Sequence, residues 1–175
     1  RGVPKDDKES AKWRTLAAEQ GNSQSQFNLG VMYENGKGVP QDNKTAVKWY
    51  RLAAEQGDVF GQNALGNMYD AGRGVPKDDK ESAKWRTLAA EQGNSQSQYN
   101  LGVMYENGRG VPQDDKEAVK SYRLAAEQGD ALGQNALGNM YYTGKGVPKD
   151  DKESVKWRIL AAEQGNAQSQ FNLGV

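Results

Sequence analysis

Paired aspartates are the residues of this 175-residue chain whose type and spacing could do chemistry. Two neighbouring carboxylates could hold calcium, or act as acid and base in glycoside hydrolysis. A calcium loop, however, needs alternating oxygen ligands and a distal glutamate, and a glycosidase needs two acids of unequal pKa across a cleft. Each pair precedes a run of good helix formers, where the helix dipole favours negative charge. We therefore interpret the pairs as helix caps, with weak cation binding as the alternative: Asp6-Asp7, Asp78-Asp79, Asp114-Asp115 and Asp150-Asp151.

No other motif supports catalysis. The chain contains no cysteine and no histidine, which removes disulfides, thiolate and imidazole metal ligands, and Cys–His and Ser–His nucleophile pairs. Gly36-Lys37-Gly38 has too few glycines for a phosphate loop and no strand before it, so we interpret it as the end of a helix. We predict that the protein is not an enzyme and that it binds no metal and no cofactor.

Charge and hydropathy limit the classes of partner that the protein could bind. The 23 basic and 23 acidic side chains give a net charge of zero, so we predict that nucleic acid is not a partner. A mean hydropathy of −0.95 predicts no membrane insertion. No signal peptide opens this chain, and its compartment is left open, because a parent protein could be secreted or periplasmic.

The chain is one unit repeated. The tripeptide Gly-Val-Pro returns every 36 residues, starting at Gly2, Gly38, Gly74, Gly110 and Gly146. A second period of 72 residues overlies the first, because residues 1–36 and 73–108 differ only at Phe27 and Tyr99. Such strict placement is typical of a solenoid, in which each unit presents the same surface to its neighbour. We predict one solenoid over 1–175, a fragment of a longer array, with units 1–36, 37–72, 73–108, 109–144 and an incomplete 145–175.

Each unit reads as two helices. Asp6 and Glu9 have the spacing of a capping box before a first helix that ends at Gly21, and Asn22 is the expected cap of a second helix that ends at Gly36. Gly30, in the middle of the second helix, costs about 1 kcal/mol relative to alanine, so its recurrence predicts close approach of a neighbouring helix. The repeated tryptophan of the first helix is expected to pack between helices with the leucine three residues on.

A family resemblance rests on the run Leu101-Gly102-Val103-Met104-Tyr105-Glu106-Asn107-Gly108-Arg109-Gly110-Val111-Pro112, followed by Asp114, Ala118, Ala125-Ala126 and Gly129. This pattern resembles a Sel1-like repeat, a relative of the tetratricopeptide repeats, and it covers the whole chain. The resemblance implies an all-α solenoid, a right-handed superhelix of antiparallel helix pairs, and a bacterial origin. The chain departs from the usual pattern at Leu16 and its equivalents, often Lys, at Arg14 and its equivalents, often aromatic, and at Ser121, which replaces Trp.

The resemblance also implies where a ligand binds. In tetratricopeptide-like superhelices, the helix carrying Leu-Gly and Tyr lines a concave groove, and the positions that face this groove vary among the present units. Their asparagine amides could satisfy an extended peptide backbone, their aromatic rings could anchor apolar side chains, and their carboxylates could favour basic ones. The candidate groove residues are Phe27, Val31, Phe60, Asn63, Asn67, Asp70, Tyr99, Val103, Glu106, Leu132, Asn135, Asn139 and Tyr142.

Two other interpretations stay open. An apolar residue five positions before the repeated leucine always accompanies Asn two positions before it, so the variation could conserve packing volume or follow from copying a two-unit block. The protein could also be a structural spacer that associates end to end, and a cell-wall or lactam hydrolase is the least supported reading. We favour a non-catalytic scaffold that binds a protein or peptide ligand in its groove.

Overall fold

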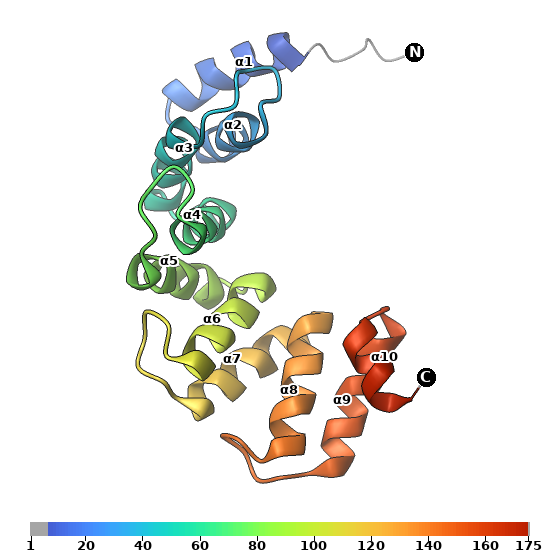
Figure 1. Ribbon diagram of the computed structural model, residues 1–175. Coiled ribbons are helices and arrows are strands. Elements are labelled where there is room, and N and C mark those ends of the chain that lie inside the picture. Colours follow the sequence, from blue (N-terminus) through green and yellow to red (C-terminus); the bar gives the residue numbers. More distant parts are fainter. Residues whose placement is uncertain (1–6, 175) are drawn as a thin grey trace, which may run out of the picture. The chain divides into compact units, whose positions relative to one another are not determined.

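The computed structural model describes residues 7–174, and these residues form ten α-helices and no strand (Figure 1). The predicted all-α repeat solenoid is therefore confirmed, and each helix lies within one or two residues of its predicted bounds. The helices are α1 (Asp7–Glu19), α2 (Ser23–Asn35), α3 (Asn43–Glu55), α4 (Val59–Ala71), α5 (Asp79–Glu91), α6 (Ser95–Asn107), α7 (Asp115–Glu127), α8 (Ala131–Thr143), α9 (Asp151–Glu163) and α10 (Ala167–Leu173).

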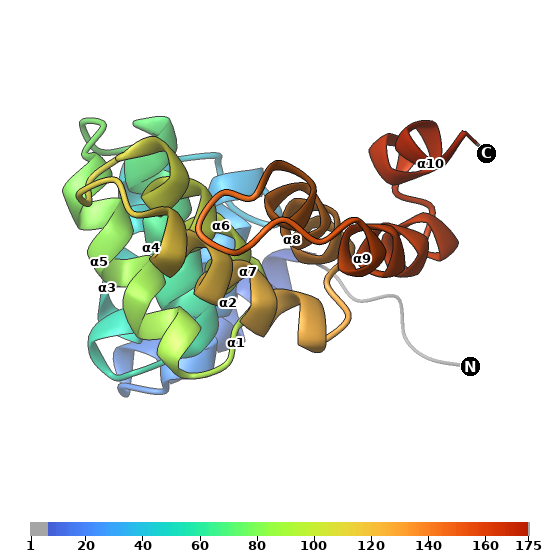
Figure 2. The ribbon, with the colours of Figure 1, turned by 90° about the horizontal axis from the view of Figure 1, so that it is seen from below.

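The chain divides inside α5 into two compact units, one up to Trp85 and one from Arg86. In the first unit, α2 packs against α1 and α3, and α3 packs against α4. In the second unit, α7 packs against α6 and α8, and α9 packs against α8 and α10 (Figure 2). Inside each unit, these successive helices thus pack against one another, as a repeat array requires.

Aspartates begin the first helix of each helix pair, as the capping interpretation predicted. The Asp114 carboxylate accepts hydrogen bonds from the backbone N–H groups of Lys116 (2.9 Å) and Glu117 (3.1 Å). Asp42, Asp78 and Asp150 cap α3, α5 and α9 in the same way. These contacts satisfy N–H groups that have no partner within the helix. The equivalent Asp6 lies outside the described residues.

Asparagine or aspartate begins the second helix of each pair, and glycine ends it. The Asn22 side chain accepts a hydrogen bond of 2.7 Å from the backbone N–H of Ser25 at the start of α2. Gly36 ends that helix with a φ of +67°, a left-handed conformation that glycine adopts at little cost. The prediction that the repeated asparagine and glycine delimit the second helix is confirmed.

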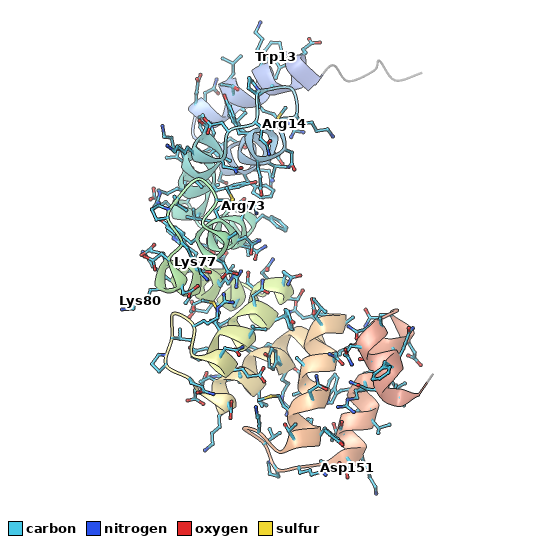
Figure 3. All side chains as sticks on the ribbon, in the orientation of Figure 1. Trp13, Arg14, Arg73, Lys77, Lys80 and Asp151 are labelled. Atoms are coloured by element: carbon cyan, nitrogen blue, oxygen red, sulfur yellow. The ribbon has the colours of Figure 1, made fainter. Side chains whose placement is uncertain are left out.

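Each unit has a continuous apolar core. In the first unit, Val47, Tyr50 and Met68 pack together with the buried ring of Trp85. In the second unit, Val119, Tyr122 and Met140 pack with Trp157. Burial of both tryptophans confirms their packing role, whereas Trp13 projects from α1 and is 61% exposed (Figure 3).

The leucine expected to accompany the tryptophan is not part of these cores. Leu160 of α9 is 38% exposed, whereas Trp157 is 9% exposed. The tryptophan is buried by residues of other helices, with Leu137 and Met140 of α8 among them. The predicted partnership is therefore wrong, because the leucine three positions on lies on a different, more exposed face of the same helix.

Glutamines join successive 36-residue repeats through side-chain contacts that no motif of the sequence indicates. Gln26 is buried, and its side-chain NH₂ donates a hydrogen bond of 3.0 Å to the carbonyl of Ala18. Its side-chain oxygen accepts a hydrogen bond of 2.6 Å from Gln56. Gln128 and Gln98 repeat this pairing at 2.6 Å in the second unit. The only signal in the sequence is that both glutamines recur in every unit.

Candidate functional site

The predicted groove residues form two patches, one in each compact unit. Patch 1 comprises residues of α2 and α4: Phe27, Val31, Phe60, Asn63, Asn67 and Asp70. Patch 2 comprises residues of α6 and α8: Tyr99, Val103, Glu106, Leu132, Asn135, Asn139 and Tyr142. All thirteen are partly or largely accessible to solvent.

An aromatic cluster lies at the centre of patch 1. The ring of Phe27 lies 5.8 Å from that of Tyr50 and 5.8 Å from that of Phe60, measured between centroids. Tyr50 is buried, Phe27 is half-buried, and Phe60 is 51% exposed. The three rings thus run from the core to the surface, and Phe60 presents apolar area to solvent on a rigid support.

The polar members of patch 1 surround this cluster. Asn63, Asn67 and Asp70 are half-buried on α4, and each has an interaction partner within the chain. Val31 is half-buried and packs against the core cluster. The packing interpretation therefore accounts for part of this patch, because Phe27 and Val31 both cover the core, whereas the exposed ring of Phe60 is not explained by packing.

A carboxylate of α2 borders patch 1 and is already engaged. The Tyr50 hydroxyl donates a hydrogen bond of 2.5 Å to Glu34, and the Arg73 guanidinium forms an ion pair with Glu34 at 2.8 Å. Burial, and then the hydrogen bond to Glu34, raises the pKa of the Tyr50 phenol well above its usual value. Figure 3 labels Arg73 after α4. The charge of Glu34 is thus compensated within the first unit.

Patch 2 repeats the aromatic support with different outer residues. The Tyr99 ring lies 5.8 Å from the buried ring of Tyr122, and Leu132 is 44% exposed where patch 1 has Phe60. Tyr142 is 53% exposed, and the Arg158 guanidinium lies 4.9 Å from the centre of its ring. Val103 packs against the core cluster, as Val31 does. Patch 2 therefore offers one aliphatic and one aromatic side chain to a ligand.

The asparagines of patch 2 have structural partners. The side-chain oxygen of Asn139 accepts a hydrogen bond of 2.8 Å from Arg158, and that of Asn135 accepts one of 2.8 Å from Ser169. These contacts tie α8 to α9 and α10. The side-chain oxygens of Asn135 and Asn139 thus contribute to helix packing.

The carboxylate of patch 2 differs from its counterpart in patch 1. Glu106 accepts a hydrogen bond of 2.7 Å from the Tyr122 hydroxyl. Within residues 7–174 it has no ion-pair partner, because Lys145 occupies the position equivalent to Arg73 and does not reach it. Burial, followed by the negative charges of Asp130 and Glu106, raises the pKa of Tyr99. Of the two equivalent glutamates, Glu106 is therefore the one whose charge is not compensated by an ion pair within the described residues.

The two patches present aromatic rings, amides and carboxylates. Among the residues that the structure describes, no three acidic, histidine or cysteine side chains gather as a metal site would require. The raised pKa values belong to buried tyrosine hydroxyls that donate to carboxylates, which keeps both tyrosines protonated. Exposed rings, amides and one uncompensated carboxylate suit recognition of another molecule.

Across residues 7–174, the structure has no helix whose length and apolar character would allow it to span a membrane.

The repeated helix pairs define the protein as an all-α repeat solenoid. The chain belongs to the Sel1 repeat family, whose model matches residues 1–22, 23–58, 59–94, 95–130 and 131–166. Each complete family unit begins at the second helix of the units defined above, so that α2 pairs with α3. Sel1 repeat proteins generally serve as scaffolds for protein interactions.

Solved structures agree with this assignment. A protective antigen from uropathogenic Escherichia coli strains is 46% identical, with a TM-score of 0.96, over 99% of this chain and 37% of the antigen. A Sel1 repeat protein from Oxalobacter formigenes is 40% identical, with a TM-score of 0.88, over 98% of this chain and 50% of that protein. Cysteine rich protein B of Helicobacter pylori is 29% identical, with a TM-score of 0.59, over 74% of this chain and 92% of that protein.

The chain thus spans half or less of the first two of these proteins. A comparison with curated proteins found no match.

Proposed function

We propose that the protein is a non-catalytic scaffold that binds a peptide or protein segment through patch 1 and patch 2. The observation that carries this proposal is the ring of Phe60, half-exposed and supported from below by Phe27 and Tyr50. Rigid aromatic side chains that rest on a packed core lose little conformational freedom on binding, and such residues dominate binding energy in protein interfaces.

Charge refines the expected ligand at patch 2. Glu106 has no cationic partner among the described residues, and the exposed Tyr142 occupies the position in α8 that Glu106 occupies in α6. A ligand segment that combines an apolar side chain with a lysine or arginine fits this combination. Patch 1 lacks such an acid at the equivalent place, because Arg73 already neutralises Glu34.

The test uses the exposed anchors rather than the asparagines. Replacing Asn135 or Asn139 would also remove hydrogen bonds to Ser169 and Arg158, so lost binding would not separate recognition from folding. Phe60→Ser and Leu132→Ser remove exposed apolar area and leave these contacts intact. Leu124→Ser, at a 46% exposed leucine of α7 outside both patches, is the matched control.

The chain and its variants would be panned against a displayed library of random peptides, with helicity compared by circular dichroism. We expect enriched peptides that bind the chain and the L124S control equally and the F60S/L132S variant at least about tenfold more weakly, because hot-spot truncations typically cost 2 kcal/mol or more. Equal binding to all three proteins, or no enrichment, would contradict the proposal. Light scattering on the same samples tests the alternative of end-to-end self-association.

A further inference from the structure

Helix α3 differs in charge from the other first helices of the pairs. Its first turn carries no acidic residue, whereas α5, α7 and α9 each carry two. Asn43 and Thr45 occupy the places where α7 has Asp115 and Glu117. Over their thirteen residues, α3 therefore has three cations against one anion, and α7 has three against three.

This difference leaves a lysine of α3 without its usual partner. In α5, α7 and α9 the equivalent lysine pairs with the glutamate three residues before it, as Lys120 does with Glu117 at 3.4 Å. Lys48 instead follows Thr45, whose hydroxyl donates a hydrogen bond of 2.6 Å to Asp42. Among the described residues, neither Lys48 nor the neighbouring Lys44 has an ion-pair partner. Asp42 is the acid nearest to them in sequence. The pKa of Asp42 is lowered mainly by its hydrogen bonds from Thr45 and, to a smaller extent, by the charge of Lys48.

The two lysines border a groove between α3 and the loop that follows α4. The groove has a volume of about 490 Å³; Leu52 and Val75 provide its exposed apolar surface above the buried Val47, and Lys44, Lys48 and Arg51 provide three cations. Leu52 is 44% exposed. The loop that follows α4 lies against α3 (Figure 1). Only glycine at position 74 allows this close approach, because a Cβ there would overlap the backbone oxygen of Asn43. We call this site the α3 groove.

Arg51 is held in place within the α3 groove. Its guanidinium donates a hydrogen bond of 2.5 Å to the Tyr69 hydroxyl and lies 5.8 Å from the centre of the Tyr69 ring. A cation with a neutral partner keeps its charge uncompensated, so Arg51 adds to the positive potential of the two lysines. The groove is thus an apolar surface enclosed by positive charge.

We propose that the α3 groove binds an acidic peptide segment that carries apolar side chains. Carboxylates of the ligand would contact Lys44 and Lys48, and an apolar side chain would cover Leu52 and Val75. Charge complementarity of this kind favours one class of partner and speeds its association. A nucleic acid fits less well, because the apolar surface would remain uncovered and the whole chain has no net charge.

Helix α7 provides an internal control for this site. The groove residues of α3 all have identical counterparts in the second unit, among them Lys116, Val119, Lys120 and Leu124. The helices themselves differ only at three positions, of which two are the acids of α7 and the third is Ser121 in place of Trp49. The proposal therefore predicts strong binding at α3 and weaker binding at its near copy.

The experiment measures fluorescence anisotropy of a short labelled peptide of alternating glutamate and leucine. We expect K44E/K48E to weaken binding at least about fivefold and K116E/K120E less than about twofold, with N43D/T45E, which restores the acids of α7, weakening it about threefold. A peptide of alternating glutamate and serine should bind at least about fivefold more weakly than the leucine peptide. Circular dichroism checks that each variant folds.

Four results would overturn the proposal: no binding of the leucine peptide, equal losses at α3 and α7, equal binding of the serine peptide, or tighter binding of a thymidine oligonucleotide than of the peptide. The F60S/L132S variant should bind the acidic peptide as well as the unchanged chain does. Failure of patch 1 and patch 2 as a site is thereby distinguished from failure of the α3 groove.

Discussion

The ring of Tyr50 packs directly on Gly30, so closely that a Cβ on Gly30 would lie 2.5 Å from Cδ1 of the ring and 2.6 Å from Cε1. This contact brings α2 and α3 together at the one position of α2 where a side chain would prevent their approach. It also fixes Tyr50 beneath Phe27 and beside Glu34. The glycine of the core thus determines where the aromatic support of patch 1 stands.

Replacing this glycine should destabilise the protein despite the better helix propensity of alanine. Gly30→Ala gains about 1 kcal/mol of propensity but forces Tyr50 to move, and overpacking of this kind typically costs about 1–3 kcal/mol. We expect a net loss of about 1 kcal/mol in the free energy of unfolding by urea. Gln24→Ala, an exposed position of the same helix, is the control and should change it by less than about 0.5 kcal/mol. A more stable G30A would show that Tyr50 relaxes freely.

The recurrence of this glycine was readable from the sequence, and so were the helix limits. Both depend on local chemistry: a glycine that persists against helix propensity needs a packing reason, and an aspartate or asparagine before a helix caps it. The exposure of the leucines cannot be predicted in this way, because apolar type alone does not determine burial. Leu160 lies on a helix face that the neighbouring helices leave open, and only the packing geometry shows which face that is.

The candidate site was predictable in part for the same reason. Helical spacing places Phe27 and Val31 on one face, but it does not reveal which carboxylates are compensated. Glu34 forms an ion pair with Arg73, which lies 39 residues later in the sequence. Among the described residues, Glu106 has no such partner, because the equivalent loop position holds Lys145, whose side chain is shorter than that of arginine. The pairing of Gln26 with Gln56 cannot be predicted from the sequence, because glutamine is uncharged and usually exposed, and its type gives no sign of a partner 30 residues away.

The paired side chains of Gln26 and Gln56 should contribute to the free energy of unfolding. Gln26→Ala removes one of two hydrogen bonds to the carbonyl of Ala18, which also accepts one of 3.0 Å from the Gly21 N–H, and the loss of one such bond costs about 0.5–1.5 kcal/mol. A double-mutant cycle with Gln56→Ala isolates the 2.6 Å contact between the two side chains, for which we expect about 1 kcal/mol of coupling. Gln24→Ala again serves as the exposed control. If the effects of the two substitutions are additive, the contact between Gln26 and Gln56 contributes nothing to stability.

Alkaline pH should weaken the fold through its buried tyrosines. Burial, followed by hydrogen bonding to a glutamate, raises the pKa of Tyr50 and Tyr122 above the usual value of about 10. Above that pH the unfolded chain releases these protons and the folded chain retains them, so the free energy of unfolding falls as pH rises. The limiting slope is about 1.4 kcal/mol per pH unit for each tyrosine.

Urea unfolding at pH 9 and at pH 11 measures this effect. Y50F/Y122F should be less dependent on pH in this window than the unchanged chain, because neither phenylalanine ionises. Tyr142→Phe is the matched control, since its ring is exposed and its pH dependence should resemble that of the unchanged chain. An unaltered slope in Y50F/Y122F would show that other groups govern alkaline unfolding.

The charge difference between the two patches should be visible in ligand selection. If patch 2 receives a basic side chain at Glu106, then Glu106→Gln should weaken the binding of peptides that contain lysine or arginine by about fivefold or less, the usual range for an accessible ion pair. Glu34→Gln is the matched control, because Arg73 already compensates that carboxylate, and its removal should leave the same peptides bound. Raising the salt concentration should diminish the effect of E106Q, since accessible ion pairs are screened. Equal losses in both variants would place the basic side chain of the ligand elsewhere.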